Sequence, residues 1–353
     1  MNNQAYIDFI KYCLAEEKTL PLSVREIDWK DFFGFCSKQA ILGVVLEGMN
    51  QAVRDVLNVS TEILLEWIGT CEMIRHQNSV LNKQCEELQR LFAKGGFNSC
   101  ILKGQGNARM YPNPAGRMPG DIDIWIDGEK EEIKKYVHSI VSDAHSGYKD
   151  VAFQYKGTSV EAHFIPSYLN NFKYNKRYQK YIAENRERQF ANKVQIDDGV
   201  TISVPTDDFN VIYQMAHLYH HFFCEGIGMR QFIDYFYILK REYIKSKQEE
   251  VRNFFKVFGM ESFAKGVMWI EKEILGLERQ YLIVEPDERL GQLFFKEMLT
   301  YGNFNNENMI GKSATRVKIS NTFRPFRYLL SFPAASMARI FFTGWLQVRK
   351  IWS

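Results

Sequence analysis

The hydrophobic pattern of residues 1–96 predicts helices. Apolar side chains recur at helical spacing near the start of the chain and again between residues 63 and 71. A hydroxyl at Ser60 or Thr61 can cap a long helix, which is expected to end near Gly95-Gly96. No Pro/Gly/Ser-rich linker follows, so this N-terminal helical region is expected to pack against the segment that comes next.

The pattern changes to short strands after this region. The apolar run Phe97–Leu102 predicts a buried strand, and carboxylate and apolar side chains alternate from Asp121, which is typical of a strand. The predicted elements are strands at 97–102 and 121–126, a helix at 129–141, and hairpin strands at 148–156 and 159–165 around a Gly157-Thr158 turn. Region 97–175 is therefore expected to hold a small mixed sheet.

Helical spacing returns in region 176–311, where one predicted hairpin interrupts it. The hairpin covers Val194–Val204, and a helix is expected to begin just after Pro205. Further helices are predicted at 229–241 and 251–275, and the last segment is 312–353. The whole pattern predicts an α+β fold, in which a small mixed sheet is flanked by N-terminal and C-terminal helical regions.

Composition places the chain among ordinary globular proteins, because 46% of its residues are hydrophobic and 25% are charged. No run approaches the roughly 18 apolar residues of a membrane span, and no basic and apolar leader opens the sequence. The six cysteines are scattered without a CxxC pair, which indicates reduced thiols rather than a zinc site. These observations predict a cytoplasmic protein.

The net charge of +3 conceals an uneven distribution. Segment 312–353 contains eight Lys or Arg and no Asp or Glu, so the rest of the chain is mildly acidic. Aromatic residues alternate with basic ones over 323–330 and 340–352, a pattern that suits an anionic membrane surface. The same pattern suits nucleic acid. A helix that packs onto the body through its aromatic face is the third alternative.

The densest chemical signal is a glycine-rich turn followed by two carboxylates. Gly104 and Gly106 allow backbone N–H groups to approach a phosphate. Asp121 and Asp123 lie two residues apart, so a strand directs both carboxylates to one face. Two such carboxylates repel each other unless a cation lies between them, and hard oxygen ligands select Mg²⁺ or Mn²⁺. A phosphate cradle beside a metal pair is what nucleotidyl transfer requires.

These motifs resemble an uncharacterised bacterial nucleotidyltransferase family. The resemblance covers about residues 97–240 and is carried by these segments: Leu102-Lys103-Gly104, Tyr111-Pro112, Arg117, Gly120-Asp121-Ile122-Asp123, Val160-Glu161-Ala162-His163, Pro205, His217 and Gly228–Asp234. The resemblance implies that the small mixed sheet is of the nucleotidyltransferase type. It also implies that Asp121 and Asp123 are the metal-binding pair and that Glu161 is the third carboxylate. Gln105 departs from the Gly or Ser usual in the superfamily, and Lys103 can supply the missing triphosphate contact.

The remaining candidate residues each have two interpretations. Glu161 is either a metal ligand or general base, or an exposed residue on the polar face that it shares with His163. Lys103 either contacts phosphate or is a surface lysine whose aliphatic part lies along apolar residues. Arg117 either contacts phosphate or braces the loop that precedes Asp121. Arg230 either faces phosphate or forms an intrahelical ion pair with Asp234.

The function predicted from the sequence is Mg²⁺- or Mn²⁺-dependent transfer of a nucleoside monophosphate from an NTP, such as ATP, to an unidentified acceptor. The expected nucleotide-binding residues are Lys103, Gly104, Gln105, Gly106, Arg117 and Arg230. One alternative is a non-catalytic scaffold that keeps the fold. Another is an accessory protein at the inner membrane surface in envelope or polysaccharide synthesis, which the basic aromatic segment suggests.

Overall fold

The computed structural model describes residues 3–16, 19–49, 54, 56–57, 59–302 and 323–351. The chain divides into two compact units. Unit 1 comprises Met1–Phe33, Ile41–Ser167 and Glu184–Asn210, and unit 2 comprises Gly34–Ala40, Tyr168–Ala183 and Val211–Ser353. The four regions predicted from the sequence, with boundaries at 96, 175 and 311, stay a prediction.

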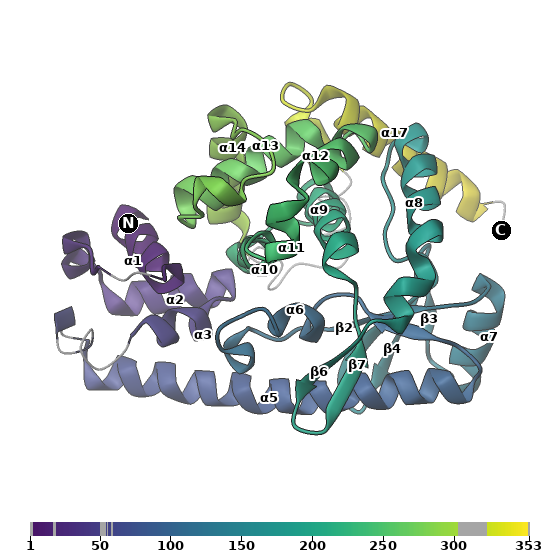
Figure 1. Ribbon diagram of the computed structural model, residues 1–353, viewed down its shortest axis with the longest axis horizontal. Helices are drawn as coiled ribbons and strands as arrows, with labels where there is room; N and C mark the ends of the chain where they lie inside the picture. Colours follow the sequence, from purple (N-terminus) through teal and green to yellow (C-terminus); the bar gives the residue numbers. More distant parts are fainter. Residues whose placement is uncertain are drawn as a thin grey trace. The chain divides into compact units, whose positions relative to one another are not determined.

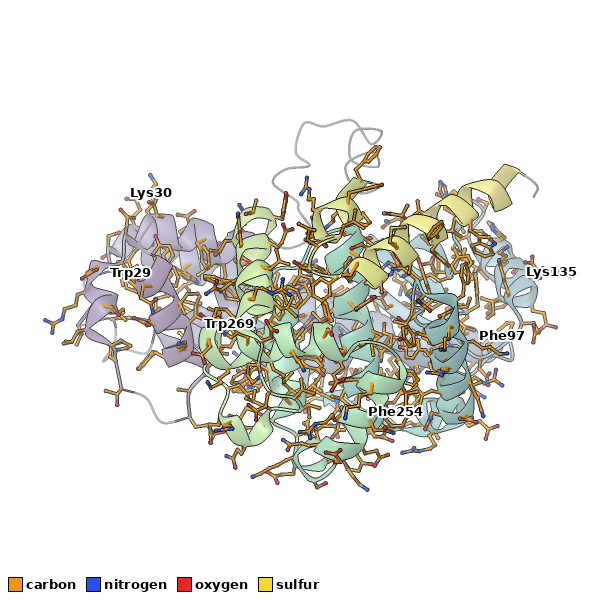
Figure 2. All side chains as sticks on the ribbon, turned by 90° about the horizontal axis from the view of Figure 1, so that it is seen from above. Trp29, Lys30, Phe97, Lys135, Phe254 and Trp269 are labelled. Carbon is orange, nitrogen blue, oxygen red and sulfur yellow. The ribbon has the colours of Figure 1, made fainter. Side chains whose placement is uncertain are left out.

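Unit 1 begins with helices, as the hydrophobic spacing predicts. The helices are α1 (Asn3–Leu14), the 3-10 turn η1 (Leu22–Glu26), the start of α2 (Trp29–Gln39), α3 (Leu42–Gly48) and the long α5 (Thr61–Lys94). The ring of Trp29, labelled in Figure 2, meets Phe9 edge-on at 5.5 Å. The Ser60 side chain accepts a hydrogen bond from the backbone N–H of Ile63, which confirms the predicted N-cap of α5.

Unit 1 contains a five-stranded mixed sheet, of which β2, β3 and β4 are labelled in Figure 1. Its strands are β1 (Ser99–Ile101), β2 (Ile122–Ile126), β3 (His145–Ser146), β4 (Asp150–Tyr155) and β5 (Thr158–His163), in the order β1-β2-β5-β4-β3. The β2 and β5 strands are parallel, and the other pairs are antiparallel. This sheet, set in a largely helical chain, confirms the α+β prediction.

One face of the sheet covers the hydrophobic core. Buried residues of α5, of α7 (Lys130–Ile140) and of β7 (Val200–Ser203) meet alternate residues of β2, β4 and β5 there. The sheet residues in this core are Ile122, Ile124, Ile126, Val151, Phe153, Val160 and Ala162. Because strand side chains alternate between faces, residues 123, 125, 161 and 163 are directed to the opposite face. There Trp125 stacks on Phe209 and contacts Phe190.

The hairpin between β4 and β5 turns one residue earlier than predicted. Its central residues are Lys156 and Gly157, both with positive φ (49° and 83°), and Tyr155 pairs with Thr158. Positive φ at both positions is typical of the type I′ turn, whose twist matches that of the flanking strands. The predicted Gly157-Thr158 turn was therefore wrong by one position, although both hairpin strands are present.

Two shorter pieces complete unit 1. After β1 the chain forms the four-residue helix α6 (Gln105–Ala108) and the 3-10 turn η2 (Pro114–Gly116). The predicted second hairpin is confirmed as β6 (Lys193–Asp197) and β7, which pair with each other. It follows α8 (Phe172–Ala191), whose second half belongs to unit 1.

Unit 2 is helical over its described part. Its elements are α9 (Asp207–Cys224, which starts in unit 1), α10 (Met229–Leu239), α11 (Glu242–Ser246), α12 (Gln248–Val257), α13 (Glu261–Trp269), the π-turn η3 (Ile270–Ile274), η4 (Arg279–Tyr281), α14 (Glu288–Tyr301), η6 (Arg324–Tyr328) and α17 (Pro333–Ile351). The helix predicted at 251–275 is interrupted, because Gly259 adopts φ 68° between α12 and α13. A Cβ at Gly291 would collide with the ring of Trp269 (Figure 2), so this glycine allows α14 to approach α13 closely.

The basic aromatic segment is partly buried and partly exposed. Within unit 2, Phe342 on α17 is buried and stacks on Tyr168 at 5.1 Å. Met337, Phe341 and Trp345, spaced four residues apart on the same helix, are exposed. Residues 312–322 and 352–353 of this segment lie outside the described residues. No helix in the described part of the chain is long and apolar enough to cross a bilayer.

Candidate active site

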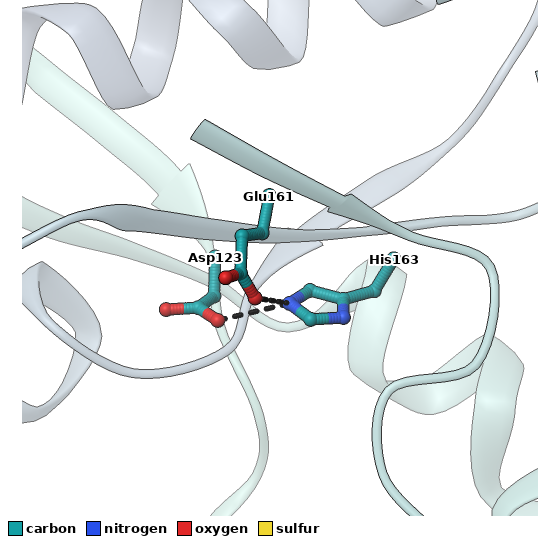
Figure 3. A group of neighbouring side chains, drawn as sticks. All are labelled: Asp123, Glu161 and His163. Atoms are coloured by element: carbon teal, nitrogen blue, oxygen red, sulfur yellow. Dashed lines mark hydrogen bonds and ion pairs between the residues drawn. The ribbon is translucent and has the colours of Figure 1, made fainter. Parts of the chain in front are cut away.

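A polar cluster lies on the sheet face opposite the core. Asp123 on β2 pairs directly with Glu161 on β5 in parallel register, and Trp125 pairs with His163. The register places Asp123, Glu161 and His163 side by side, as Figure 3 shows. The Nε2 atom of His163 lies 2.9 Å from Oδ1 of Asp123 and 3.4 Å from Oε2 of Glu161.

Two lysines neutralise part of this cluster. The Lys103 ammonium lies 2.9 Å from Oδ2 of Asp123. Burial alone would lower the pKa of Lys103, but the neighbouring carboxylates, Asp123 first, outweigh burial and raise it. The Lys149 ammonium bridges two carboxylates, at 3.0 Å from Glu161 and 3.2 Å from Asp150. Its pKa is raised as well, because these carboxylates outweigh the effect of burial.

The environment of His163 favours its neutral form. Burial is the main cause that lowers its pKa well below the ordinary value, and the charge of Lys149 acts in the same direction. A neutral imidazole carries one N–H, and here Nε2–H donates to the Asp123 carboxylate. The other nitrogen, Nδ1, is buried and has no hydrogen-bond partner among the described residues. It lies 3.9 Å from Oδ2 of Asp150.

The cluster retains an excess of negative charge. Burial, the largest cause, raises the pKa of Asp150 to about 6, so this carboxyl group is mostly ionised at neutral pH. Asp121 precedes β2 and is not one of the three side chains whose donor atoms converge, but its charge also acts on Lys103 and His163. The four carboxylates of Asp121, Asp123, Asp150 and Glu161 face the two ammonium groups of Lys103 and Lys149. Carboxyl groups therefore outnumber ammonium groups in this cluster.

The donor atoms suit a divalent cation. One carboxylate oxygen each from Asp123 and Glu161 and a ring nitrogen of His163 all lie within 4.8 Å of one another. Two hard oxygen donors and one imidazole can bind Mg²⁺ or Mn²⁺. The excess of carboxyl over ammonium groups in the cluster favours a cation at this point. The residues present thus fit the metal that the sequence predicts.

The chain matches the model of a known protein family. A family model described as an uncharacterised nucleotidyltransferase matches residues 25–276, well over half of the chain. The chain belongs to this family. The match extends beyond the 97–240 segment on which the sequence resemblance rests, and it includes all three clustered side chains. No curated protein and no solved structure matches the chain.

The glycine-rich turn of this nucleotidyltransferase-family protein consists of two glycines and, between them, a glutamine that contacts α5. Gly104 adopts φ 57°, and a Cβ at this residue would lie 3.7 Å from the backbone oxygen of Asp121, so the turn lies beside the start of β2. Gln105 is buried and donates to the backbone oxygen of Asn78 and the side chain of Asn82 on α5. Gly106 packs closely, because a Cβ would lie 3.3 Å from Val204.

Gln105 also lines a pocket of about 250 Å³, together with residues of α5, of η2 and of the end of β6. Asp123, Glu161 and His163 do not line this pocket. The side chain of Gln105 is thus engaged with α5, while Lys103, two residues earlier, reaches the acidic cluster. The nucleotide-binding roles assigned to Lys103, Gly104, Gln105 and Gly106 stay predictions.

The two predicted arginines are both buried. Arg117 donates to the backbone oxygen of Met118, and its own backbone oxygen accepts from Asn78. Arg230 lies on α10 in unit 2. A phosphate-binding role for either residue stays a prediction.

Lys149 and Asp150 were not anticipated from the sequence. The signal that could have found them is the hairpin register, because Asp150 is the antiparallel partner of His163. A turn placed at Lys156-Gly157 pairs these two residues by counting along both strands. The predicted turn at Gly157-Thr158 instead pairs His163 with Ala152, so the two residues remained outside the predicted site.

Proposed function

We propose that this protein transfers a nucleoside monophosphate from an NTP to a hydroxyl group of an acceptor, with Mg²⁺ or Mn²⁺ as the cofactor. The observation that carries the proposal is the convergence of Asp123 and Glu161 on one point of the sheet face. The excess negative charge of the cluster supports a cationic cofactor. Membership of a nucleotidyltransferase family supports the type of reaction.

The reaction is a displacement at the α-phosphorus. The hydroxyl oxygen of the acceptor forms a bond to this phosphorus, and the bond from phosphorus to the α,β-bridging oxygen breaks. Pyrophosphate leaves, and the hydroxyl proton passes to a base. A divalent cation supplies charge neutralisation for the triphosphate and alignment of the reacting oxygens.

The residues of the chain have separate roles in this proposal. Asp123 and Glu161 hold the cation, together with Asp121 just before β2, and Glu161 is also the candidate base, because its partly exposed side chain is accessible to an acceptor hydroxyl. Lys103 exchanges its contact with Asp123 for a phosphate oxygen of the nucleotide. Gly104 permits the left-handed turn that places Lys103 beside β2.

Nucleotide and metal binding can be tested without knowing the acceptor. Thermal unfolding of the full chain is measured with ATP, GTP, CTP and UTP, each with Mg²⁺, with Mn²⁺ and without metal. A ligand that binds the native state raises the melting temperature. We expect at least one NTP to raise it only when the cation is present, and Asp123→Asn to abolish that increase.

Catalysis is tested by pyrophosphate release from the NTP that binds, with water as a slow acceptor. We expect Glu161→Gln to reduce the rate by about 100-fold or more. Glu132→Gln, a change at an exposed position of α7, is the matched control. Cation-dependent NTP binding without any pyrophosphate release would favour the scaffold alternative. Absence of both would overturn the proposal.

For the C-terminal segment we propose contact with an anionic membrane surface. The exposed stripe of Met337, Phe341 and Trp345 supplies apolar groups that can enter the headgroup region. Segment 312–353 supplies positive charge without any acidic residue, which complements anionic lipid. Nucleic acid is the competing partner, and it becomes an outcome of the binding test described below.

A further inference from the structure

We propose that His163 is a direct ligand of the divalent cation, and that Asp150 is the positioning residue that orients it. The consequence is a site that prefers Mn²⁺ to Mg²⁺. This inference rests on the cation site of the proposed function and defines its ligands and its selectivity. If aspartate and glutamate were the only protein ligands, the ligand set would not favour Mn²⁺ over Mg²⁺.

The orientation of the imidazole ring supports the inference. Its Nε2 atom faces both carboxylates of the candidate site, at 2.9 Å from Asp123 and 3.4 Å from Glu161 (Figure 3). His163 is 1% exposed, so the ring is held in the interior rather than free at the surface. The Nε2 atom therefore lies where it could be the third protein ligand of a cation that the two carboxylates bind.

The second nitrogen supplies an independent observation. Nδ1 is buried without a hydrogen-bond partner among the described residues, which is a costly state for a polar atom. The carboxylate of Asp150 lies 3.9 Å from it, too far for a hydrogen bond. A shift of about 1 Å would bring the two atoms within hydrogen-bonding distance.

Cation binding would give the buried Nδ1 a hydrogen-bond partner through a change of tautomer. The proton moves from Nε2 to Nδ1, and the imidazole stays neutral throughout. Nε2 then offers its lone pair to the cation, and Nδ1–H donates to Asp150. Metal-ligating histidines almost always donate their other ring N–H to a carboxylate, a carbonyl oxygen or water. The structure places the unpartnered Nδ1 and the Asp150 carboxylate, the two groups that this hydrogen bond requires, 3.9 Å apart.

The surroundings hold Asp150 in place for this role. It is the antiparallel strand partner of His163, so the backbone sets the two side chains beside each other. Lys149 fixes its carboxylate at 3.2 Å. Gly147 makes room for the same carboxylate, because a Cβ at this position would collide with Oδ1 of Asp150.

The ligand chemistry leads to the metal preference. Mg²⁺ favours oxygen ligands and retains several waters, whereas Mn²⁺ accepts imidazole nitrogen more readily. One nitrogen among the protein ligands therefore lowers the affinity for Mg²⁺ relative to Mn²⁺. The expected result is that Mn²⁺ binds the protein at least about tenfold more tightly than Mg²⁺.

Electron paramagnetic resonance with Mn²⁺ alone tests the proposal without any substrate. Bound Mn²⁺ is titrated through loss of the signal of the free ion, and Mg²⁺ affinity is obtained by competition. Electron spin-echo modulation then reports whether a ¹⁴N nucleus is directly bonded to the ion. We expect imidazole ¹⁴N modulation in the wild type, its loss in His163→Gln, and a Mn²⁺ affinity reduced by about 10–100-fold in Asp150→Asn.

Matched controls separate ligation from folding. His138→Gln replaces an exposed histidine of α7, and Asp127→Asn replaces an aspartate just after β2 that pairs with Arg186. Both should keep the nitrogen signal and the affinity. Circular dichroism and thermal unfolding verify that each variant is folded, and Gly147→Ala offers a second way to displace the Asp150 carboxylate.

The outcomes distinguish this inference from the proposed function. If Mn²⁺ binds with no ¹⁴N modulation and Asp123→Asn abolishes its binding, the role of His163 is overturned and the cation site stands. If ¹⁴N modulation is present and Asp150→Asn leaves the Mn²⁺ affinity unchanged, the positioning role of Asp150 is overturned. If neither cation binds the wild-type protein, the inference and the metal-dependent function are overturned together.

Discussion

Asp123 and Glu161 are direct neighbours on the parallel strands β2 and β5, although α7, β3 and β4 lie between them in the sequence. Parallel pairing requires such a long connection. It also places side chains of equal register on the same face, so the two carboxylates converge without any help from a loop. The precision of the site therefore depends on the sheet, which suits a cation that needs several ligands at fixed distances.

Replacement of Asp123 by Asn should abolish cation-dependent NTP binding and also destabilise the protein. If Asp123 had no basic partner, removing its charge would relieve repulsion from the other carboxylates and stabilise the protein. Asp123 is instead buried and lies 2.9 Å from the Lys103 ammonium. Loss of its charge leaves a largely buried ammonium group less well compensated. We expect the free energy of unfolding to fall by about 1–3 kcal/mol, measured by urea denaturation without metal. Asp127→Asn, at a more exposed ion pair, should change it by less than about 1 kcal/mol.

Glu271 should make the stability of the protein pH-dependent. Both of its carboxylate oxygens are buried without a hydrogen-bond partner among the described residues, and burial raises its pKa well above the ordinary value. The folded state therefore retains this proton at pH values where the unfolded chain has released it. The stabilisation is complete below the unfolded-state pKa, and it is lost as pH rises through the folded-state pKa, by up to about 1.4 kcal/mol per pH unit.

The measurement is urea unfolding of the wild type and of Glu271→Gln between pH 5 and pH 9. The variant cannot ionise at this position, so its stability relative to the wild type should increase with pH. Glu273→Gln, on the same π-turn but with a partly exposed side chain, is the control and should follow the wild type. Parallel curves for Glu271→Gln and the wild type would show that the buried carboxyl does not titrate differently on folding.

The long helix α5 and the sheet should unfold as one unit. Leu88 on α5 is fully buried in the same hydrophobic core as Ile124 and Val160. We expect Leu88→Ala to lower the free energy of unfolding by about 2–5 kcal/mol, because it removes buried methyl groups and leaves a cavity. Fluorescence and circular dichroism should report one shared transition. A folded 97–353 fragment released by limited proteolysis would contradict this packing.

The exposed stripe of α17 should bind anionic vesicles. Replacing Met337, Phe341 and Trp345 together by Ser removes the apolar groups without changing charge, so co-sedimentation with phosphatidylserine vesicles should fall by about tenfold or more. The control exchanges Leu65 and Met73, two exposed apolar residues of α5, for Ser. Equal binding to neutral and anionic vesicles would remove the electrostatic part of this proposal. Binding to single-stranded oligonucleotides instead would favour nucleic acid.

The hairpin β4–β5 shows where sequence reasoning reached its limit. Alternation of apolar and polar residues identified both strands, and a glycine identified the turn to within one residue. A one-residue error in the turn moves the register by two residues, which preserves the face of each side chain but changes its partner. Glu161 and His163 were therefore placed on one face, while Lys149 and Asp150 were overlooked.

Local periodicity was sufficient for the elements themselves. The cap of α5 at Ser60, the alternation through Asp123 and the glycine turn at Gly104 depend on neighbours within a few residues, so the sequence by itself determined them. The parallel pairing of β2 with β5 depends on which strands the hydrophobic core brings together. Only the tertiary structure could therefore decide that Lys103, Lys149 and His163 surround the two carboxylates, because ion pairs between distant segments leave no periodic trace in a sequence.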